Sequence, residues 1–213
     1  MSHFNANGSR YIGCIVVQGQ SNSEYIKAIK RGWEGFQIIF STWDDTDTSL
    51  YTENDIVIYN PYPEDRGVAN LGYQKLSTQK GFLKARELGW ERAVKWRSDQ
   101  WPKNGVEFYK LFTADALNVY AWMNHNGGYI CDYFVEGDIQ SVIDLYEVPA
   151  HCQFPEKNLT QSLFEKGLNR NARCIVKGVK EECDMYSGKW ETWFGDFSES
   201  DLYTADIPTE WNP

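Results

Sequence analysis

The sequence predicts an α/β protein whose central sheet is mixed, mostly parallel and flanked by helices. Short, nearly continuous runs of Ile, Val and aromatic residues recur through its first hundred residues, and such runs are typical of strands buried on both faces. Stretches of helical period separate these runs, as in βαβ units. Polar clusters follow several runs directly, at the strand ends where a parallel sheet places its ligand crevice.

The elements of the first half follow from local patterns. Residues 11–17 (YIGCIVV) form the first apolar run, and Ile26 and Ile29 share one face of the amphipathic stretch after it. In a later stretch one apolar side of a helix is marked by Leu76, Leu83 and the neighbouring Phe82, Ala85 and Leu88, and Gly89 can end that helix. The predicted elements are strands at 11–17, 36–40, 55–59 and 91–97 and helices at 23–32 and 70–88.

In the second half of the sequence, residues typical of turns and of helix starts indicate where the elements begin and end. The Asn-Gly-Gly run within 124–128 predicts a turn between two strands, Asp138 is an acidic helix start, and Pro155 suits a first helical turn. The predicted elements are a helix within 101–117, strands at 117–123 and 129–135, helices at 138–146 and 155–166, and a strand at 174–176.

Composition narrows the possible functions. The chain has 213 residues, 21 basic and 30 acidic, with a net charge of -9. This size predicts a disordered lead-in at 1–10 and one domain over 11–213. The acidic balance argues against partners such as nucleic acid or an anionic membrane surface. A phosphate-bearing ligand would need local neutralisation. Aromatic residues make up 15% of the chain, which favours a sugar or nucleotide ligand in addition to core packing.

Other sequence features concern location. The longest apolar runs fall well short of the 18 or so residues that span a membrane. The first ten residues do not have the basic and apolar regions of a secretory signal. The five cysteines include no CxxC pair, which fits neither a zinc ribbon nor a closed disulfide framework. We therefore expect a cytoplasmic protein with reduced thiols.

Polar clusters at successive strand ends are the candidate site. They are Gln18-Gly19-Gln20, Thr42-Trp43-Asp44-Asp45, Asn60 and Arg97-Ser98-Asp99. The motifs GxGxxG, GxSxG, HExxH and the P-loop are absent from the sequence. A strand-end carboxylate such as Asp99 can hold Mn²⁺ or Mg²⁺ against diphosphate oxygens, and the metal then neutralises a departing nucleotide. The structural alternative is that Asp99 caps a turn.

Two segments carry a family resemblance. Residues 70–83 (NLGYQKLSTQKGFL), followed by 94–99 (VKWRSD), resemble the WavE-type lipopolysaccharide-synthesis glycosyltransferases, in which a helix N-x-x-x-Q-x-x-S-T-x-x-G-L precedes a strand K-x-R-S-D. Residues 132–137 (DYFVEG) and 154–156 (FPE) resemble two further elements of that family. The size of the chain is also similar to that of the N-terminal glycosyltransferase domain of chlorella-virus capsid-glycan enzymes.

This resemblance implies a GT-A fold, a UDP-sugar donor, a Mn²⁺ or Mg²⁺ cofactor and a glycan or glycoprotein acceptor. It also implies a location in the cytoplasm, that of the host if the protein is viral, and further domains of a longer polyprotein-like enzyme. Asp99 takes the place of the metal-binding acid of the family's DxD element. The sequence departs from that element by having one acid where two are usual.

The expected site residues combine the strand-end clusters with the matched helix. The expected nucleotide-sugar contacts are Gln18, Gly19, Thr42, Trp43, Asp44, Gln74, Lys75, Thr78, Arg97 and Ser98. Asp132 is the first candidate for the base that takes the proton of the acceptor hydroxyl, and Glu156 is the second. As alternatives, Gln74 and Thr78 could lie on an exposed helix face, and either acid could be a helix cap or a supporting hydrogen-bond acceptor.

Three functions follow from these residues. The first is an inverting, metal-dependent glycosyltransferase that uses a UDP-sugar. The alternative is a non-catalytic carbohydrate-binding or assembly module that uses Trp190, Trp193 and Phe194 as a stacking surface. A Rossmann-like methyltransferase ranks last because its usual glycine-rich first turn is missing from this sequence.

Overall fold

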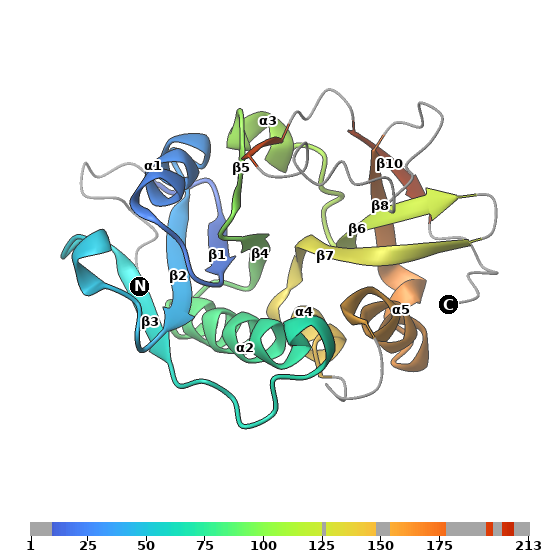
Figure 1. The fold of residues 1–213 in the computed structure, drawn as a ribbon. Helices are drawn as coiled ribbons and strands as arrows, with labels where there is room; N and C mark the ends of the chain where they lie inside the picture. The colour runs from blue at the N-terminus through green and yellow to red at the C-terminus, as the bar shows by residue number, and fades with distance from the viewer. Residues whose placement is uncertain (1–9, 125–126, 148–153, 178–194, 198–201, 207–213) are drawn as a thin grey trace.

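A mixed eight-stranded sheet forms the centre of the protein. The computed structural model describes residues 10–124, 127–147, 154–177, 195–197 and 202–206 (Figure 1). The strands in the order β10-β8-β6-β7-β4-β1-β2-β3 make up this sheet, and β5 and β9 pair separately. Their bounds are β1 Cys14–Gln18, β2 Gln37–Trp43, β3 Ile56–Asn60, β4 Arg92–Arg97, β5 Gln100–Pro102, β6 Leu117–Asn124, β7 Gly127–Asp138, β8 Ala172–Lys177, β9 Gly195–Phe197 and β10 Leu202–Asp206.

Parallel pairing dominates the sheet. Strands β3, β2, β1 and β4 run parallel to one another, and β6 runs parallel to β8. Strand β7 is antiparallel to both β4 and β6, and β10 is antiparallel to β8. The predicted fold class, α/β with a mixed and mostly parallel central sheet, is confirmed.

Helices cover both faces of this sheet. Helices α1 (Ser23–Gly32) and α3 (Gly105–Tyr109) lie on one side, and α2 (Leu71–Glu87), α4 (Ile139–Leu145) and α5 (Pro155–Glu165) lie on the other (Figure 1). Three short 3-10 helices, Thr48–Leu50, Val68–Asn70 and Leu168–Asn171, complete the description. Each helical layer therefore has its own apolar cluster against the sheet.

Strand β1 shows why both layers form. Its side chains alternate between the faces because the period of a strand is two. Val16 lies in the cluster under α2, whereas Ile15 and Val17 lie in the cluster under α1. All three side chains are buried. The continuous apolar run of the sequence thus supplies both cores at once, as predicted.

Helix α2 lies on the sheet through small and polar residues. Gly81 and Thr78 are buried on its inner side, whereas Leu76 and Leu83 are only half-buried. A Cβ at Gly81 would come within 2.2 Å of Val16 Cγ1. The predicted apolar side is confirmed for Phe82 and Ala85, which are fully buried, and for Leu88, which packs against the core. It is wrong for Leu76 and Leu83, because the helix approaches β1 closely at Gly81 and a small residue is needed there.

Most predicted elements are present, with shifted ends. Strand β2 extends to Trp43 and β7 to Asp138, beyond their predicted limits, and β5, β9 and β10 were not predicted. In the predicted turn, Asn124 pairs with Gly127. The expected lead-in at 1–10 lies outside the described residues apart from Arg10. None of the helices in the described segments has the length and apolar character needed to cross a membrane.

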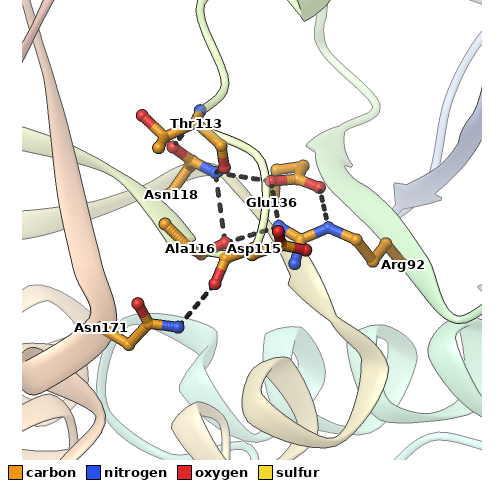
Figure 2. A network of polar contacts seen from close by, with 7 residues as sticks. All are labelled: Arg92, Thr113, Asp115, Ala116, Asn118, Glu136 and Asn171. Atoms are coloured by element: carbon orange, nitrogen blue, oxygen red, sulfur yellow. Dashed lines mark hydrogen bonds and ion pairs between the residues drawn. The ribbon is translucent and has the colours of Figure 1, made fainter.

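A buried ion pair ties the start of β4 to β6 and β7. Arg92 binds Glu136 through two contacts, Nε to Oε1 at 3.0 Å and Nη2 to Oε2 at 2.9 Å (Figure 2). Asn118 Nδ2 donates to the same carboxylate at 2.6 Å and to the carbonyl oxygen of Thr113 at 3.0 Å. Burial raises the pKa of Glu136 above its ordinary value, although Arg92 opposes this. The network holds the turn before β6 in place.

We expect Arg92→Met to lower the free energy of unfolding by about 2 to 3 kcal/mol, because it leaves a buried carboxylate without its counter-ion. The double variant Arg92→Met/Glu136→Gln removes the orphaned charge and should regain part of the loss. Urea unfolding followed by circular dichroism measures both. A double variant no more stable than Arg92→Met would contradict the charge-based account.

Candidate functional site

A cleft opens at the carboxyl ends of β1 and β4, where a parallel sheet of this kind is expected to hold its ligand. The volume of the cleft is about 210 Å³. Its lining consists of Gln18, Gly19, Gln20, Trp43, Asn70, Tyr73, Gln74, Arg97, Ser98, Asp99 and Asp132. Five elements, β1, β2, α2, β4 and β7, bring these residues together from distant parts of the sequence.

Ser98 joins the loops after β1 and β4. Its N–H donates to the carbonyl oxygen of Gln18 at 3.1 Å, and its hydroxyl donates to that of Gln20 at 2.6 Å. The hydroxyl of Ser21 donates back to the Ser98 carbonyl oxygen at 3.0 Å. Gly19 has φ 106° and a Cβ there would lie 3.0 Å from Ser98 Oγ. Glycine is therefore needed for the turn and for the close approach of the two loops.

Arg97 is held between two carboxylates. Its Nε donates to Asp99 Oδ1 at 2.9 Å and its Nη2 to Asp99 Oδ2 at 2.6 Å. Its Nη1 lies 3.4 Å from Asp132 Oδ1, and the guanidinium lies over the ring of Tyr133 at 5.1 Å. Burial alone would lower the pKa of Arg97, but the charge of Asp132 and the bonds to Asp99 outweigh burial and raise it.

A second cation lies behind this pair. Lys95 is fully buried, and its Nζ donates to the carbonyl oxygen of Asp132. Burial lowers the pKa of Lys95 to about 8, with the Asp132 charge opposing the shift. Glu156, half-buried at the start of α5, has its pKa raised by burial and by the charge of Asp132. Asp132 thus lies within the electrostatic reach of two cations and another acid.

Unpaired polar atoms are present in and behind the cleft. In the described part of the chain, Asp132 Oδ2 and Gln74 Oε1 are buried without a hydrogen-bond partner, and both residues line the cleft. The hydroxyls of Thr78 and Tyr146 are in the same state. Buried polar atoms in proteins nearly always have a partner. Asp132 and Gln74 are therefore the groups that we expect to hydrogen-bond a ligand.

One wall of the cleft is aromatic. Trp43, at the end of β2, stacks on Tyr62 with ring centroids 5.1 Å apart and an interplanar angle of 19°. Tyr73, in the first turn of α2, contacts Trp43 at 5.0 Å. Tyr62 is fastened from outside by a hydrogen bond from its hydroxyl to Asp45 Oδ1 at 2.8 Å. The wall offers flat apolar faces beside polar amides, a suitable combination for a base or sugar ring.

The structure brings most of the predicted site residues together. Eight of them line the cleft, namely Gln18, Gly19, Trp43, Gln74, Arg97, Ser98, Asp99 and Asp132. Gln20, Asn70 and Tyr73 line it without having been assigned. Gln20 adjoins an assigned pair, and Asn70 lies four residues before Gln74, one helical turn away. The positions of Gln20 and Asn70 relative to assigned residues could therefore have identified both of them from the sequence.

The other five predicted residues do not line the cleft. Thr42 is fully buried and its hydroxyl shares a 2.8 Å hydrogen bond with that of Thr46. Asp44 is exposed beyond the end of β2. Thr78 is buried under α2 one turn beyond Gln74, and Lys75 lies close enough to Glu147 to lower the pKa of that acid. Glu156 lies behind Asp132. Successive side chains of a strand point to opposite faces of the sheet, and only one face of a helix is turned to the cleft, so neighbouring residues in the sequence can lie in different surroundings.

The residues offer a divalent cation few ligands, so it would bind weakly alone and more tightly when a bound ligand shares it. No group of three His, Cys, Asp or Glu side chains converges within the described segments. Asp99 and Asp132 supply hard oxygen donors of the kind that Mg²⁺ and Mn²⁺ accept. The guanidinium of Arg97 already occupies a cation position between them. Phosphate oxygens of a ligand would have to complete the coordination.

Comparisons with known proteins add little to this description. No protein-family model matches the sequence, and no curated protein is significantly similar to it. Among solved structures, one described as a glucose-1-phosphate thymidylyltransferase from Bacillus anthracis in complex with a sucrose matches with a TM-score of 0.41 and 10% sequence identity. The match covers 77% of this chain and 86% of that one. This likeness concerns the course of the backbone, so any function has to be argued from the residues.

The buried Lys95 makes the stability of the protein depend on pH. With its pKa lowered to about 8, Lys95 loses its proton in the folded state before it does so in the unfolded state. The unfolded state then binds more protons between about pH 8 and pH 10.5, so the contribution of Lys95 to stability rises with pH across that window. Relative to Lys95→Met, the wild type should gain up to about 3 kcal/mol there.

Urea unfolding of both proteins at pH 7, 8, 9 and 10 tests this expectation. Tyrosines that titrate in the same range are present in both proteins, so their effects cancel in the difference. A constant difference would show that the buried amine does not titrate in this window.

Proposed function

We propose that this chain is a glycosyltransferase with a GT-A fold that moves a sugar from a UDP-sugar donor to a glycan acceptor, with inversion at the anomeric carbon and help from Mn²⁺ or Mg²⁺. The single observation that carries the proposal is the composition of the cleft. A basic group for a diphosphate, an unpaired buried carboxylate oxygen and an aromatic wall meet at the carboxyl ends of β1 and β4.

The parts of a nucleotide sugar have counterparts along the cleft. Trp43 and Tyr73 offer faces on which a base can stack, and the amides of Gln18 and Asn70 can bond its edges. Arg97 carries the forked donor set that fits phosphate oxygens. A volume of about 210 Å³ is below the roughly 300–1,000 Å³ of pockets that enclose drug-sized ligands. A cleft of this volume therefore suits the diphosphate and one adjoining ring.

The reaction needs a base beside the acceptor. The acceptor hydroxyl oxygen forms a bond to the anomeric carbon while the bond from that carbon to the diphosphate oxygen breaks, and the electron pair leaves with UDP. The hydroxyl proton passes to Asp132, whose Oδ2 is unpaired and whose side chain lines the cleft. Glu156 is the weaker candidate for this role, since it does not line the cleft.

Asp99 is the residue that would hold a divalent cation, together with oxygens of the donor. The cation would neutralise charge on the departing diphosphate. Lys95, behind Asp132, is fully buried, and its Nζ donates to the Asp132 carbonyl oxygen. The Ser98 bonds between the loops after β1 and β4 keep Gln18 and Arg97 in a fixed relation, so the base-binding and phosphate-binding parts move little.

The finer assignments stay predictions. These are the membership of the WavE-type family or the chlorella-virus relationship, the cytoplasmic location, the protein or glycan acceptor and further domains of a longer enzyme. The stacking residues of the alternative module, Trp190, Trp193 and Phe194, lie outside the described residues.

Thermal unfolding with UDP, GDP and CMP, each with and without Mn²⁺, tests the donor class. A ligand that binds only the folded state raises the midpoint, so we expect a rise for UDP that requires Mn²⁺. A rise caused by free oligosaccharide, without any response to nucleotides, would instead indicate a carbohydrate-binding module.

Asp132→Asn tests the base. The substitution keeps the shape of the side chain but removes the proton acceptor, so UDP affinity should stay within about threefold while transfer falls by about 100-fold or more. Isothermal calorimetry and mass spectrometry of products from a panel of UDP-sugars measure the two quantities. Transfer at the wild-type rate would remove Asp132 from the role.

A further inference from the structure

Strand β4 carries an arginine–carboxylate pair at each end, and the two pairs differ in how tightly they are closed. At its start, Arg92, which is 27% exposed, binds Glu136, whose side chain is 3% exposed and also accepts a bond from Asn118 (Figure 2). At its end, Arg97 binds Asp99, and these side chains are 26% and 25% exposed. No hydrogen bond besides those from Arg97 reaches the Asp99 carboxylate within the described segments. The second pair is therefore open to exchange.

The charges of the cleft lining explain why exchange matters. Among the lining residues that the structure describes, Arg97 is the one cation, and Asp99 and Asp132 are the anions. One positive and two negative charges leave a net charge of -1. A diphosphate adds further negative charge, while the guanidinium is already engaged by Asp99. A phosphate-bearing ligand can enter only if a cation comes with it or if Arg97 changes partner.

We propose that Arg97 is an exchangeable counter-ion. Its guanidinium occupies the cation position at Asp99 in the ligand-free protein. A divalent cation that arrives with the donor takes over the Asp99 carboxylate, and the released guanidinium turns to the diphosphate. The identification of the anion as the diphosphate of a UDP-sugar rests on the proposed function.

Three features favour this exchange. The Arg97 and Asp99 side chains are about one quarter exposed, so a ligand can reach the pair, and new bonds to phosphate oxygens can replace those that Arg97 gives up at Asp99. The fork of an arginine matches phosphate oxygens as well as it matches a carboxylate. Asp132 Oδ2, on the other side of the guanidinium, is buried in the cleft lining without a partner and remains there to receive a ligand group.

The exchange gives Arg97 opposite effects on two ligands. Arg97 competes with a metal ion that arrives alone, because both seek Asp99, but it assists a nucleotide that arrives with the metal. Binding of metal and nucleotide should accordingly be mutually favourable, and thermodynamic linkage requires the same factor in both directions. If Arg97 only supported the fold, its replacement would weaken the binding of the metal ion and of the nucleotide together.

Arg97→Gln tests the proposal by calorimetry with Mn²⁺ alone and with UDP in excess Mn²⁺. We expect Mn²⁺ alone to bind about fivefold more tightly or better, and UDP with Mn²⁺ to bind at least about tenfold more weakly. Arg86→Gln is the matched control, because it removes the same charge from the exposed side of α2, and it should leave both affinities unchanged. Mn²⁺ affinity that is unchanged or lower in a folded Arg97→Gln overturns the exchange.

A reciprocal variant covers the case in which Arg97→Gln does not fold. Asp99→Asn frees Arg97 from its partner, so inorganic pyrophosphate without metal should bind more tightly to it than to the wild type. Pyrophosphate affinity equal to that of the wild type would overturn the proposal.

The outcome also separates this inference from the proposed function. If UDP binds the wild type with Mn²⁺ but Arg97→Gln does not tighten Mn²⁺, the exchange fails and the donor assignment stands. If UDP never binds but both variants respond as expected, the exchange stands and the UDP-sugar assignment fails.

Discussion

The parallel pairing of β1 with β4 is the interaction on which the site depends. It sets Gln18 directly opposite Arg97 in register, although 78 residues separate them in the chain. Ser98 then fastens the two loops beyond the strands. Strand β7 pairs with the other edge of β4 and places Asp132 beside Arg97. A shift of one residue in either pairing would turn these side chains to opposite faces of the sheet.

The local balance of charge in the cleft matters more than the net charge of -9. Two cations, Lys95 and Arg97, lie against the carboxylates of Asp99 and Asp132 with Glu156 nearby. Lys95 is buried and cannot leave, whereas Arg97 is partly exposed and has an alternative partner in any phosphate that enters. A chain that is acidic as a whole can in this way present a basic group at one point and recruit a metal ion at the same point.

Local patterns predicted those elements whose own residues determine them. Helix α1 is amphipathic and begins at Ser23, directly after Asn22, whose side-chain oxygen accepts a hydrogen bond from the N–H of Tyr25, so its limits followed from the sequence. Strands β5 and β9 have three residues each and pair only with one another, so no period could reveal them. In α2, Phe82 and Ala85 are buried as the pattern predicts, but Leu76 and Leu83 are only half-buried, because the helix approaches β1 at Gly81, where a larger side chain does not fit.

The sequence by itself determined the α/β class and the polar strand ends, because the burial of a strand and the turn that follows it are encoded over a few residues. Six of the assigned residues from those strand ends line the cleft, and Gln74 and Asp132, which were selected through the family resemblance, also line it. Only the tertiary structure decided which neighbours in the sequence place their side chains in different surroundings. Thr42 turns into the core while Trp43 faces the cleft, and Asp99 is engaged by Arg97. The physical reason is that side-chain direction and charge partners depend on strand pairing over long distances, which the local pattern of residues does not contain.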